Sequence, residues 1–132
     1  MATILPKITE YTGNVKQVFW ETITHADDGG TTKTTHADSP ETGGLGLLAY
    51  PDKTISAAGT FGGGLSLALQ GSSDGTNWHP CHSLGGTITA SSAIALTTTL
   101  QSAVVAQNFR YYRLIRTSGS ASDVDVTMTC VR

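Results

Sequence analysis

The chain has 132 residues, about the usual size of a single domain, so we expect one domain and one core over residues 1–132. Only 14% of the residues are charged and the formal net charge is −2. This composition predicts no direct binding to nucleic acid or to an anionic membrane, because both are negatively charged and the chain has no excess of positive charge.

Residues 14–24 alternate apolar and polar side chains, which predicts a long strand with Trp20 on one face and Phe19 on the other. Residues 25–44 have no apolar periodicity and are interpreted as one long polar loop. Loops of that length are uncommon in compact domains unless they are functional or mobile. We therefore expect this loop to be a contact arm that orders on a partner.

Residues 45–50 are expected to form a short apolar strand that ends at a turn opened by Pro51. A weakly alternating stretch over residues 53–60 leads to three glycines at residues 62–64, which predict a corner. Residues 65–70 then repeat leucine with period two, the pattern of a strand with one buried face.

The dipeptide Asp74-Gly75 predicts the tight turn of a hairpin, because glycine adopts positive φ freely and aspartate caps the turn. Trp78 follows the turn, and we expect it to anchor the hairpin in the core together with Trp20. These four residues are the predicted structural turn and core positions.

Beyond Trp78, residues 87–90, 93–99 and 101–106 are expected to be short strands. Residues 109–117 and 124–130 alternate more strictly, with a turn between them. Eight to ten short strands without a helical segment predict an all-β fold. The fold class we expect is an antiparallel β-sandwich of jelly-roll-like form, since two sheets must each hide one apolar face.

The N-terminus shows no basic region followed by an apolar stretch, so we expect no secretory signal. No apolar run approaches the ~20 residues that a membrane helix needs.

Cys81 and Cys130 lie in strand-like stretches and could face one another across a sandwich. Without an export signal, reduced and buried thiols are favoured over a disulfide.

Ligand-type side chains occur in the polar loop, but flexible polar loops are rich in such residues and no pair is tied to a regular element, so we expect no metal site. A strand over residues 79–82 would place Cys81 and His82 on opposite faces. There is no Gly-x-Ser-x-Gly nucleophile elbow, and Asp123 and Asp125 are interpreted as solubilising residues. The sequence predicts a protein that is not an enzyme and needs no cofactor.

The stretch FRYYRLIR at residues 109–116 combines arginines with aromatic residues. It holds too few cations for a nucleic-acid surface, and we interpret it as an interface anchor, because the planar guanidinium binds carboxylates bidentately. The candidate interface residues in the loop and this strand are His25, Asp27, Asp28, Lys33, His36, Asp38, Arg110, Tyr112 and Arg116.

Residues 51–132 resemble a family of small structural proteins of tailed bacteriophages. The resemblance rests on PDK at 51–53, GTFGG at 59–63, LQGSSDGTNW at 69–78 and the Tyr112-Arg113 strand. It implies a β-sandwich that joins the virion, as a head decoration or cement protein on the outer capsid surface, assembled in the host cytoplasm. The implied partner is the major capsid protein, and a homodimer or homotrimer is expected on symmetric sites. Similar sandwiches occur in phage tails.

Residues 71–78 also resemble the Gly-Ser-x-Asp-Gly-x-x-Trp motif of discoidin-like carbohydrate- and lipid-binding domains. This second resemblance implies a glycan-binding module of the virion. Such a module would bind sugars through exposed aromatic rings, for which Trp78 and Tyr50 are the candidates.

Overall fold

The computed structural model describes residues 7–12, 14–23, 32–35, 47–74 and 76–132. These residues form nine strands and one short 3-10 helix, which confirms the predicted all-β antiparallel class. The elements are β1 (Lys7–Thr12), β2 (Val15–Ile23), β3 (Thr32–Thr35), the 3-10 helix η2 (Leu47–Ala49), β4 (Asp52–Ser72), β5 (His79–Pro80), β6 (Ser83–Gly86), β7 (Ala95–Leu96), β8 (Ser102–Val105) and β9 (Tyr111–Val131).

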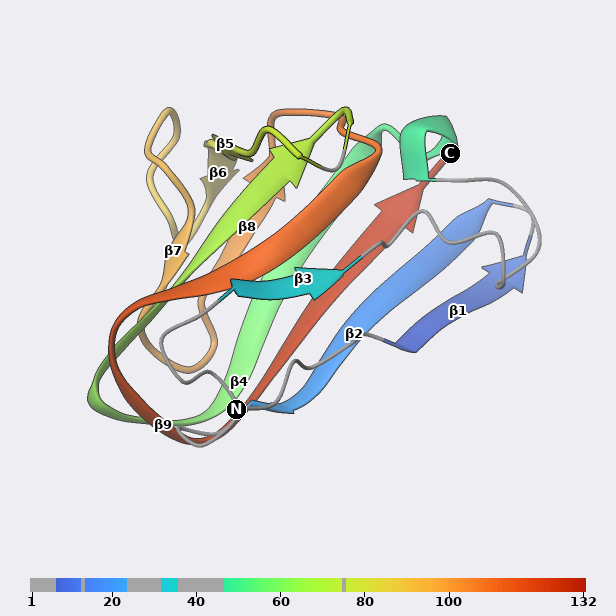
Figure 1. The fold of residues 1–132 in the computed structure, drawn as a ribbon. Helices are drawn as coiled ribbons and strands as arrows, with labels where there is room; N and C mark the ends of the chain where they lie inside the picture. The colour runs from blue at the N-terminus through green and yellow to red at the C-terminus, as the bar shows by residue number, and fades with distance from the viewer. Residues whose placement is uncertain (1–6, 13, 24–31, 36–46, 75) are drawn as a thin grey trace.

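Two long strands, β4 and β9, organise the molecule. Each has 21 residues, and they pair antiparallel from one end to the other. The prediction of short strands is therefore wrong for these two. The expected pieces 53–60 and 65–70 lie in the two halves of β4. The pieces 109–117, from Tyr111 onward, and 124–130 lie in the two halves of β9. Both strands turn back on themselves at the same level, as Figure 1 shows at its lower left.

The glycines at residues 62–64 form the predicted corner, but the strand continues through it. The register of the β4–β9 pair shifts between Gly62 and Ser66, opposite the segment around Gly119. Gly64 has φ of 72° and Gly119 has φ of 73°, a region that residues with a Cβ rarely occupy. Glycine in both strands lets the β4–β9 pair bend sharply, and the backbone pairing of the two strands continues after the bend.

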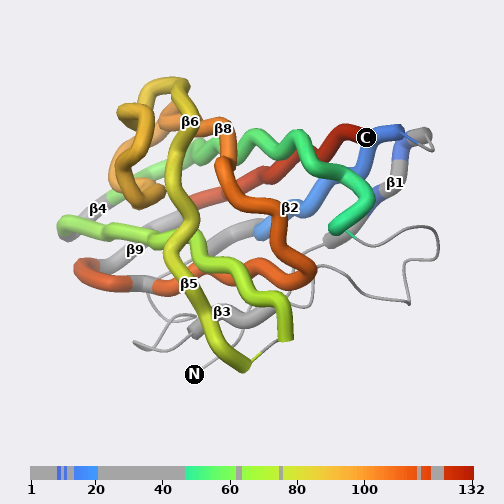
Figure 2. The backbone as a smooth tube through the Cα atoms, turned by 90° about the horizontal axis from the view of Figure 1, so that it is seen from above, coloured from blue at the N-terminus to red at the C-terminus, as the bar shows by residue number. Residues whose placement is uncertain are grey.

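The bend gives the molecule two layers from one sheet. The first contains β1, β2, the second half of β9, the first half of β4, β8 and β6. The second contains β3, the first half of β9, the second half of β4, β5 and β7. The chain from β5 to β6 runs from the second layer to the first and closes one side of the sandwich (Figure 2).

The core lies between the layers and follows the period-two pattern of the strands. In β9, Val124, Val126, Met128 and Cys130 all point inward and are buried. Trp20 is fully buried, as predicted, and its Nε1 finds no hydrogen-bond partner among the described residues. Alternation in the sequence thus identified the inward face correctly.

The predicted strand at 45–50 is wrong where the structure describes it. Leu47–Ala49 forms a 3-10 turn, and the amide of Tyr50 donates to the carbonyl of Leu47 at 3.0 Å. Leu47 and Tyr50 are both buried while Leu48 is exposed. One tight turn brings residues three apart onto the same side, so an apolar run too short to show a period was misassigned.

Candidate interaction site

The predicted hairpin after β4 is present, because β4 and β5 pair antiparallel across it. Its loop is organised by Asp74, whose carboxylate accepts the backbone amides of Thr76 and Asn77, each at 2.8 Å. The Asn77 amide and the Ser72 hydroxyl also donate to it, at 2.7 and 2.9 Å. These bonds hold the pKa of Asp74 well below its usual range. Gly75 lies outside the described residues.

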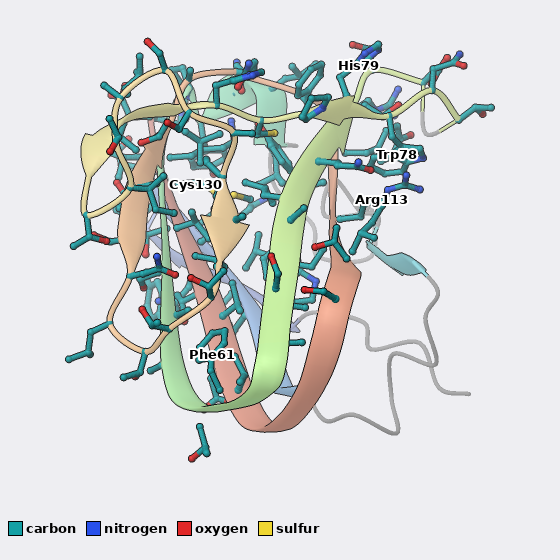
Figure 3. The ribbon with its side chains drawn as sticks, turned by 90° about the vertical axis from the view of Figure 1, so that its left-hand side faces the viewer. Phe61, Trp78, His79, Arg113 and Cys130 are labelled. Atoms are coloured by element: carbon teal, nitrogen blue, oxygen red, sulfur yellow. The ribbon has the colours of Figure 1, made fainter. Side chains whose placement is uncertain are left out.

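Trp78 is not a core residue, which corrects its predicted role. Its side chain is only partly buried, and the guanidinium of Arg113 lies over its ring, 4.4 Å from the ring centroid (Figure 3). The inward positions of this hairpin are filled by Leu69 and Cys81, so the indole is left at the surface.

Arg113 is held in place by a second contact. Its Nε donates to Oε1 of Gln70 at 2.8 Å, and the two residues are register partners on β9 and β4. Partial burial lowers the pKa of Arg113, although a guanidinium remains charged at any physiological pH. The result is a fixed planar cation stacked on an indole.

A line of aromatic rings supports the same end of the molecule. His79 stacks on Phe109 with the ring centroids 6.0 Å apart, and Phe109 meets the edge of Tyr112 at 6.3 Å. Gly71 makes this possible, because a Cβ there would lie 2.1 Å from Cδ2 of Phe109. The ring of Phe109 therefore packs directly on the backbone of β4.

Tyr112 was predicted as an interface residue, and the structure corrects this. Its side chain is fully buried, so it is not available to a partner in the folded chain. Its hydroxyl accepts the amide of Phe109 at 2.8 Å and donates to the carbonyl of Gln107 at 2.9 Å. The inward face of β9 here carries Tyr112 and Leu114, and the outward face carries the missed residue Arg113. Because Leu114 is apolar, the period-two alternation of a strand would have placed Arg113 on the outward face.

Arg110 is exposed, as a candidate contact residue must be. It lies just before β9, and its guanidinium is 5.1 Å from the ring centroid of Tyr111. We call Trp78, Arg110, Tyr111 and Arg113 the arginine–aromatic corner.

The polar loop is not entirely irregular, in contrast to the prediction. Thr32–Thr35 forms β3, which pairs antiparallel with β9 over Tyr112–Ile115. The backbone of Lys33 lies opposite Leu114, and that of Arg116 lies one residue beyond this pairing. The loop and the arginine-bearing strand, predicted separately, are thus adjacent. The other loop candidates, His25, Asp27, Asp28, His36 and Asp38, lie outside the described residues.

Two lysines are buried, which the sequence pattern did not predict. Lys16 and Lys53 lie on β2 and β4, on either side of Cys130 of β9. The ammonium of Lys53 donates to the carbonyl of Tyr50 at 2.7 Å and to Oδ1 of Asn108, and it lies 5.4 Å from the ring centroid of Tyr112. Burial lowers the pKa of Lys53 to about 8.

Cys81 and Cys130 are both free and buried, in agreement with the prediction. Burial raises the pKa of Cys81 to about 12 and that of Cys130 to about 11. Thiols with such pKa values are poor nucleophiles.

Within the described ranges, no three His, Cys, Asp or Glu side chains are grouped to hold a metal ion, and no helix is long and apolar enough to cross a membrane.

Two solved structures are similar to this one. The SPBc2 prophage-derived protein YomS aligns with 94% of this chain and 100% of its own length, at a TM-score of 0.50 and 8% identity. A chain of the disulfide-linked pili of Bacillus endospore appendages aligns with 99% of this chain and 94% of its own, at a TM-score of 0.40 and 16% identity. No protein-family model and no curated protein matches. The first structure shows that the fold occurs in a prophage-derived protein.

Proposed function

We propose that this chain is a structural component of a tailed-phage particle, and specifically a decoration or cement protein of the head. In this role it binds the outer capsid lattice and stabilises it by bridging neighbouring capsid subunits. Support comes from a fold shared with a prophage-derived protein and from a sequence that resembles phage structural proteins. The protein acts without catalysis and without a cofactor, at the virion surface after assembly in the host cytoplasm.

The arginine–aromatic corner is the observation that carries this proposal. Arginine and large aromatic side chains are the residues most enriched at binding hot spots. Arg113 is fixed by both Trp78 and Gln70, so little conformational entropy is lost when it meets a partner. The chemistry that fits this corner is a carboxylate of the major capsid protein, which the guanidinium can bind with two parallel hydrogen bonds.

A single corner of this size makes a small contact, so tight attachment requires several copies. We propose that the protein is a homodimer or homotrimer, which adds avidity to a weak individual contact. Oligomers of this kind also match the symmetry axes that a capsid lattice presents.

The test is cosedimentation of purified protein with phage heads that lack it. Arg113→Ala should raise the dissociation constant for heads at least about tenfold, which corresponds to about 1.4 kcal/mol. Tyr11→Ala is the matched control, because Tyr11 is an exposed aromatic residue on β1, away from the corner. Heads that gain no heat resistance from the protein, or that never bind it, would contradict the proposal; binding to tails instead would place it elsewhere on the virion.

A glycan-binding module is the second candidate, and one observation favours it. Trp78 is partly exposed beside the Asp74 loop, and an indole face can stack on a sugar ring. Tyr50, the other ring expected to bind a sugar, is fully buried and cannot contact a glycan in the folded chain. Binding of the soluble protein on a glycan array, lost in Trp78→Ala, would favour this candidate over capsid binding.

A further inference from the structure

One side of the sandwich is built from a segment without charge. Residues 76–109 contain no Asp, Glu, Lys or Arg, so all eight lysines and arginines and all ten acidic residues of the chain lie elsewhere. The segment forms β5, β6, β7 and β8 with their connecting turns. In Figure 3 it lies at the left and along the top of the view, beside the long strands β4 and β9. We call the β6, β8 and 97–101 part of this side the neutral wall.

Large apolar side chains stand out from the neutral wall. Leu84 on β6 is 63% exposed and Val104 on β8 is 39% exposed. The two strands pair with Ser83 opposite Val105 and Gly86 opposite Ala103, so Leu84 and Val104 are cross-strand neighbours on the outer face. Leu100, at the end of the turn that leads into β8, is 79% exposed. Leu84 and Val104 thus form a contiguous apolar pair, and contiguous exposed apolar side chains are typical of an interaction surface.

The backbone conformation of Leu100 is unfavourable for leucine. Its φ is 63°, in the left-handed region that disfavours bulky side chains. The conformation is firmly held, because the amide of Leu100 donates to the carbonyl of Ala57 at 2.8 Å. Gln101 Oε1 also accepts the amides of Thr97 and Thr98, at 2.6 and 3.0 Å. Glycine or asparagine would suit this backbone better, and a leucine that is 79% exposed gains little packing in the folded monomer.

The absence of charge points to a second copy of this chain as the partner. In a two-fold interface a patch meets a second copy of itself, so a patch whose charges all have one sign faces that same sign in its partner. The arginine–aromatic corner would bring like charges together in such a contact. The neutral wall brings none, and interface cores are depleted in charged residues.

We propose that the neutral wall is the contact between two copies of this chain, with Leu84, Leu100 and Val104 at its centre. This inference rests on the proposed function, because it names the surface of the expected homo-oligomer. It also separates two tasks: the wall joins copies, and the arginine–aromatic corner is left for the capsid lattice.

Sedimentation velocity on the purified protein tests this assignment. Wild type should sediment as a dimer, and Leu84→Asp should raise the dimer dissociation constant at least about 100-fold, because a carboxylate would be buried against its copy. Leu48→Asp is the matched control, since Leu48 is 52% exposed on η2, outside the wall. It should leave the dimer intact. A wild type that is monomeric at about 100 µM, or equal dimers in both variants, would overturn the proposal.

Leu100→Gly gives a second readout that a folding defect cannot imitate. It should raise the thermal stability of the monomer, because glycine accepts positive φ, and at the same time weaken the dimer by about tenfold or more. Lower stability with an unchanged dimer would contradict our account. Head binding separates the two proposals. A monomeric wild type that still binds heads overturns the wall and the proposed oligomer but leaves the head-binding role, and a dimer that never binds heads overturns only the head-binding role.

Discussion

The hydroxyl of Tyr112 joins two backbone groups just before β9. It accepts from the amide of Phe109 and donates to the carbonyl of Gln107, while the ring is buried between the layers. The phenol therefore fixes the path by which residues 107–110 enter the long strand. Burial raises the pKa of Tyr112, so the hydroxyl keeps its proton and can continue to donate.

Tyr112→Phe should lower the free energy of unfolding by about 1–3 kcal/mol, because a backbone donor and acceptor lose their partner. Urea denaturation measures the difference. Tyr11→Phe is the control: it removes an exposed hydroxyl that donates to Gln17 at 2.9 Å, and it should change stability by less than about 0.5 kcal/mol. Equal effects of the two substitutions would contradict a bracing role for Tyr112.

Lys53 makes stability depend on alkaline pH. The pKa of Lys53 is 10.5 in the unfolded chain, its ordinary value, whereas in the folded chain burial lowers it to about 8. Between these values the unfolded state binds more protons, so the Lys53 contribution to stability rises with pH. Below pH 8 both states are protonated and folding carries the full cost of burying the ammonium.

Wild type should therefore gain stability relative to Lys53→Met as the pH rises from 8 to 10. The thiols of Cys81 and Cys130 are present in both proteins, so their opposite effect cancels in the comparison. Denaturant titrations of the two proteins at pH 7, 8, 9 and 10 check this. A difference that stays constant, or that shifts toward Lys53→Met, would show that the Lys53 ammonium is not desolvated in the fold.

At the scale of elements, the paired bend of β4 and β9 decides the architecture. Gly64 and Gly119 both have positive φ, yet their surroundings differ. A Cβ on Gly64 would meet nothing within 4 Å, whereas one on Gly119 would lie 2.2 Å from the carbonyl carbon of Gly64. At the bend, β9 is thus packed against the backbone of β4 at Gly119, whereas β4 faces open space at Gly64.

Gly64→Ala should cost about 1–2 kcal/mol, the cost of a left-handed alanine alone. Gly119→Ala adds a clash with backbone that cannot rotate away, and it should cost about 3 kcal/mol or more. Thermal unfolding of both variants gives the comparison. Similar losses would mean that the ribbon shifts at the bend to relieve the clash.

At the scale of the whole molecule, the two thiols report on whether the layers open together. Cys130 lies on the second half of β9 in the first layer, and Cys81 donates its amide to Leu69 of the second layer at 3.1 Å. Both side chains are buried in one core. Because β4 and β9 belong to both layers, neither layer can unfold without disrupting the other.

Native protein should accordingly react slowly with a thiol reagent, and Cys81 and Cys130 should be labelled at the same rate, set by global unfolding. Mass spectrometry of peptides after timed labelling distinguishes the two sites. Faster labelling of Cys81 alone would show that the β5–β8 side opens independently. In denaturant both thiols should react at once.

Local patterns in the sequence were enough for the fold class and most of the core. Period two identified the inward face of β9 through Met128, and Asp74 identified the hairpin turn, because strand alternation and turn chemistry act over a few residues. The same patterns could not show that strands meet end to end. The glycines at 62–64 look alike whether the chain stops or bends there.

The sequence by itself thus determined an all-β chain with low charge, buried cysteines and a capped hairpin. Only the tertiary structure decided that β4 and β9 run through both layers, that Lys53 is buried and that Tyr112 is core while Arg113 is the surface cation over Trp78. Contacts between residues as distant as Gln70 and Arg113 set these outcomes. Such contacts depend on register and layer assignment, which local periodicity leaves open.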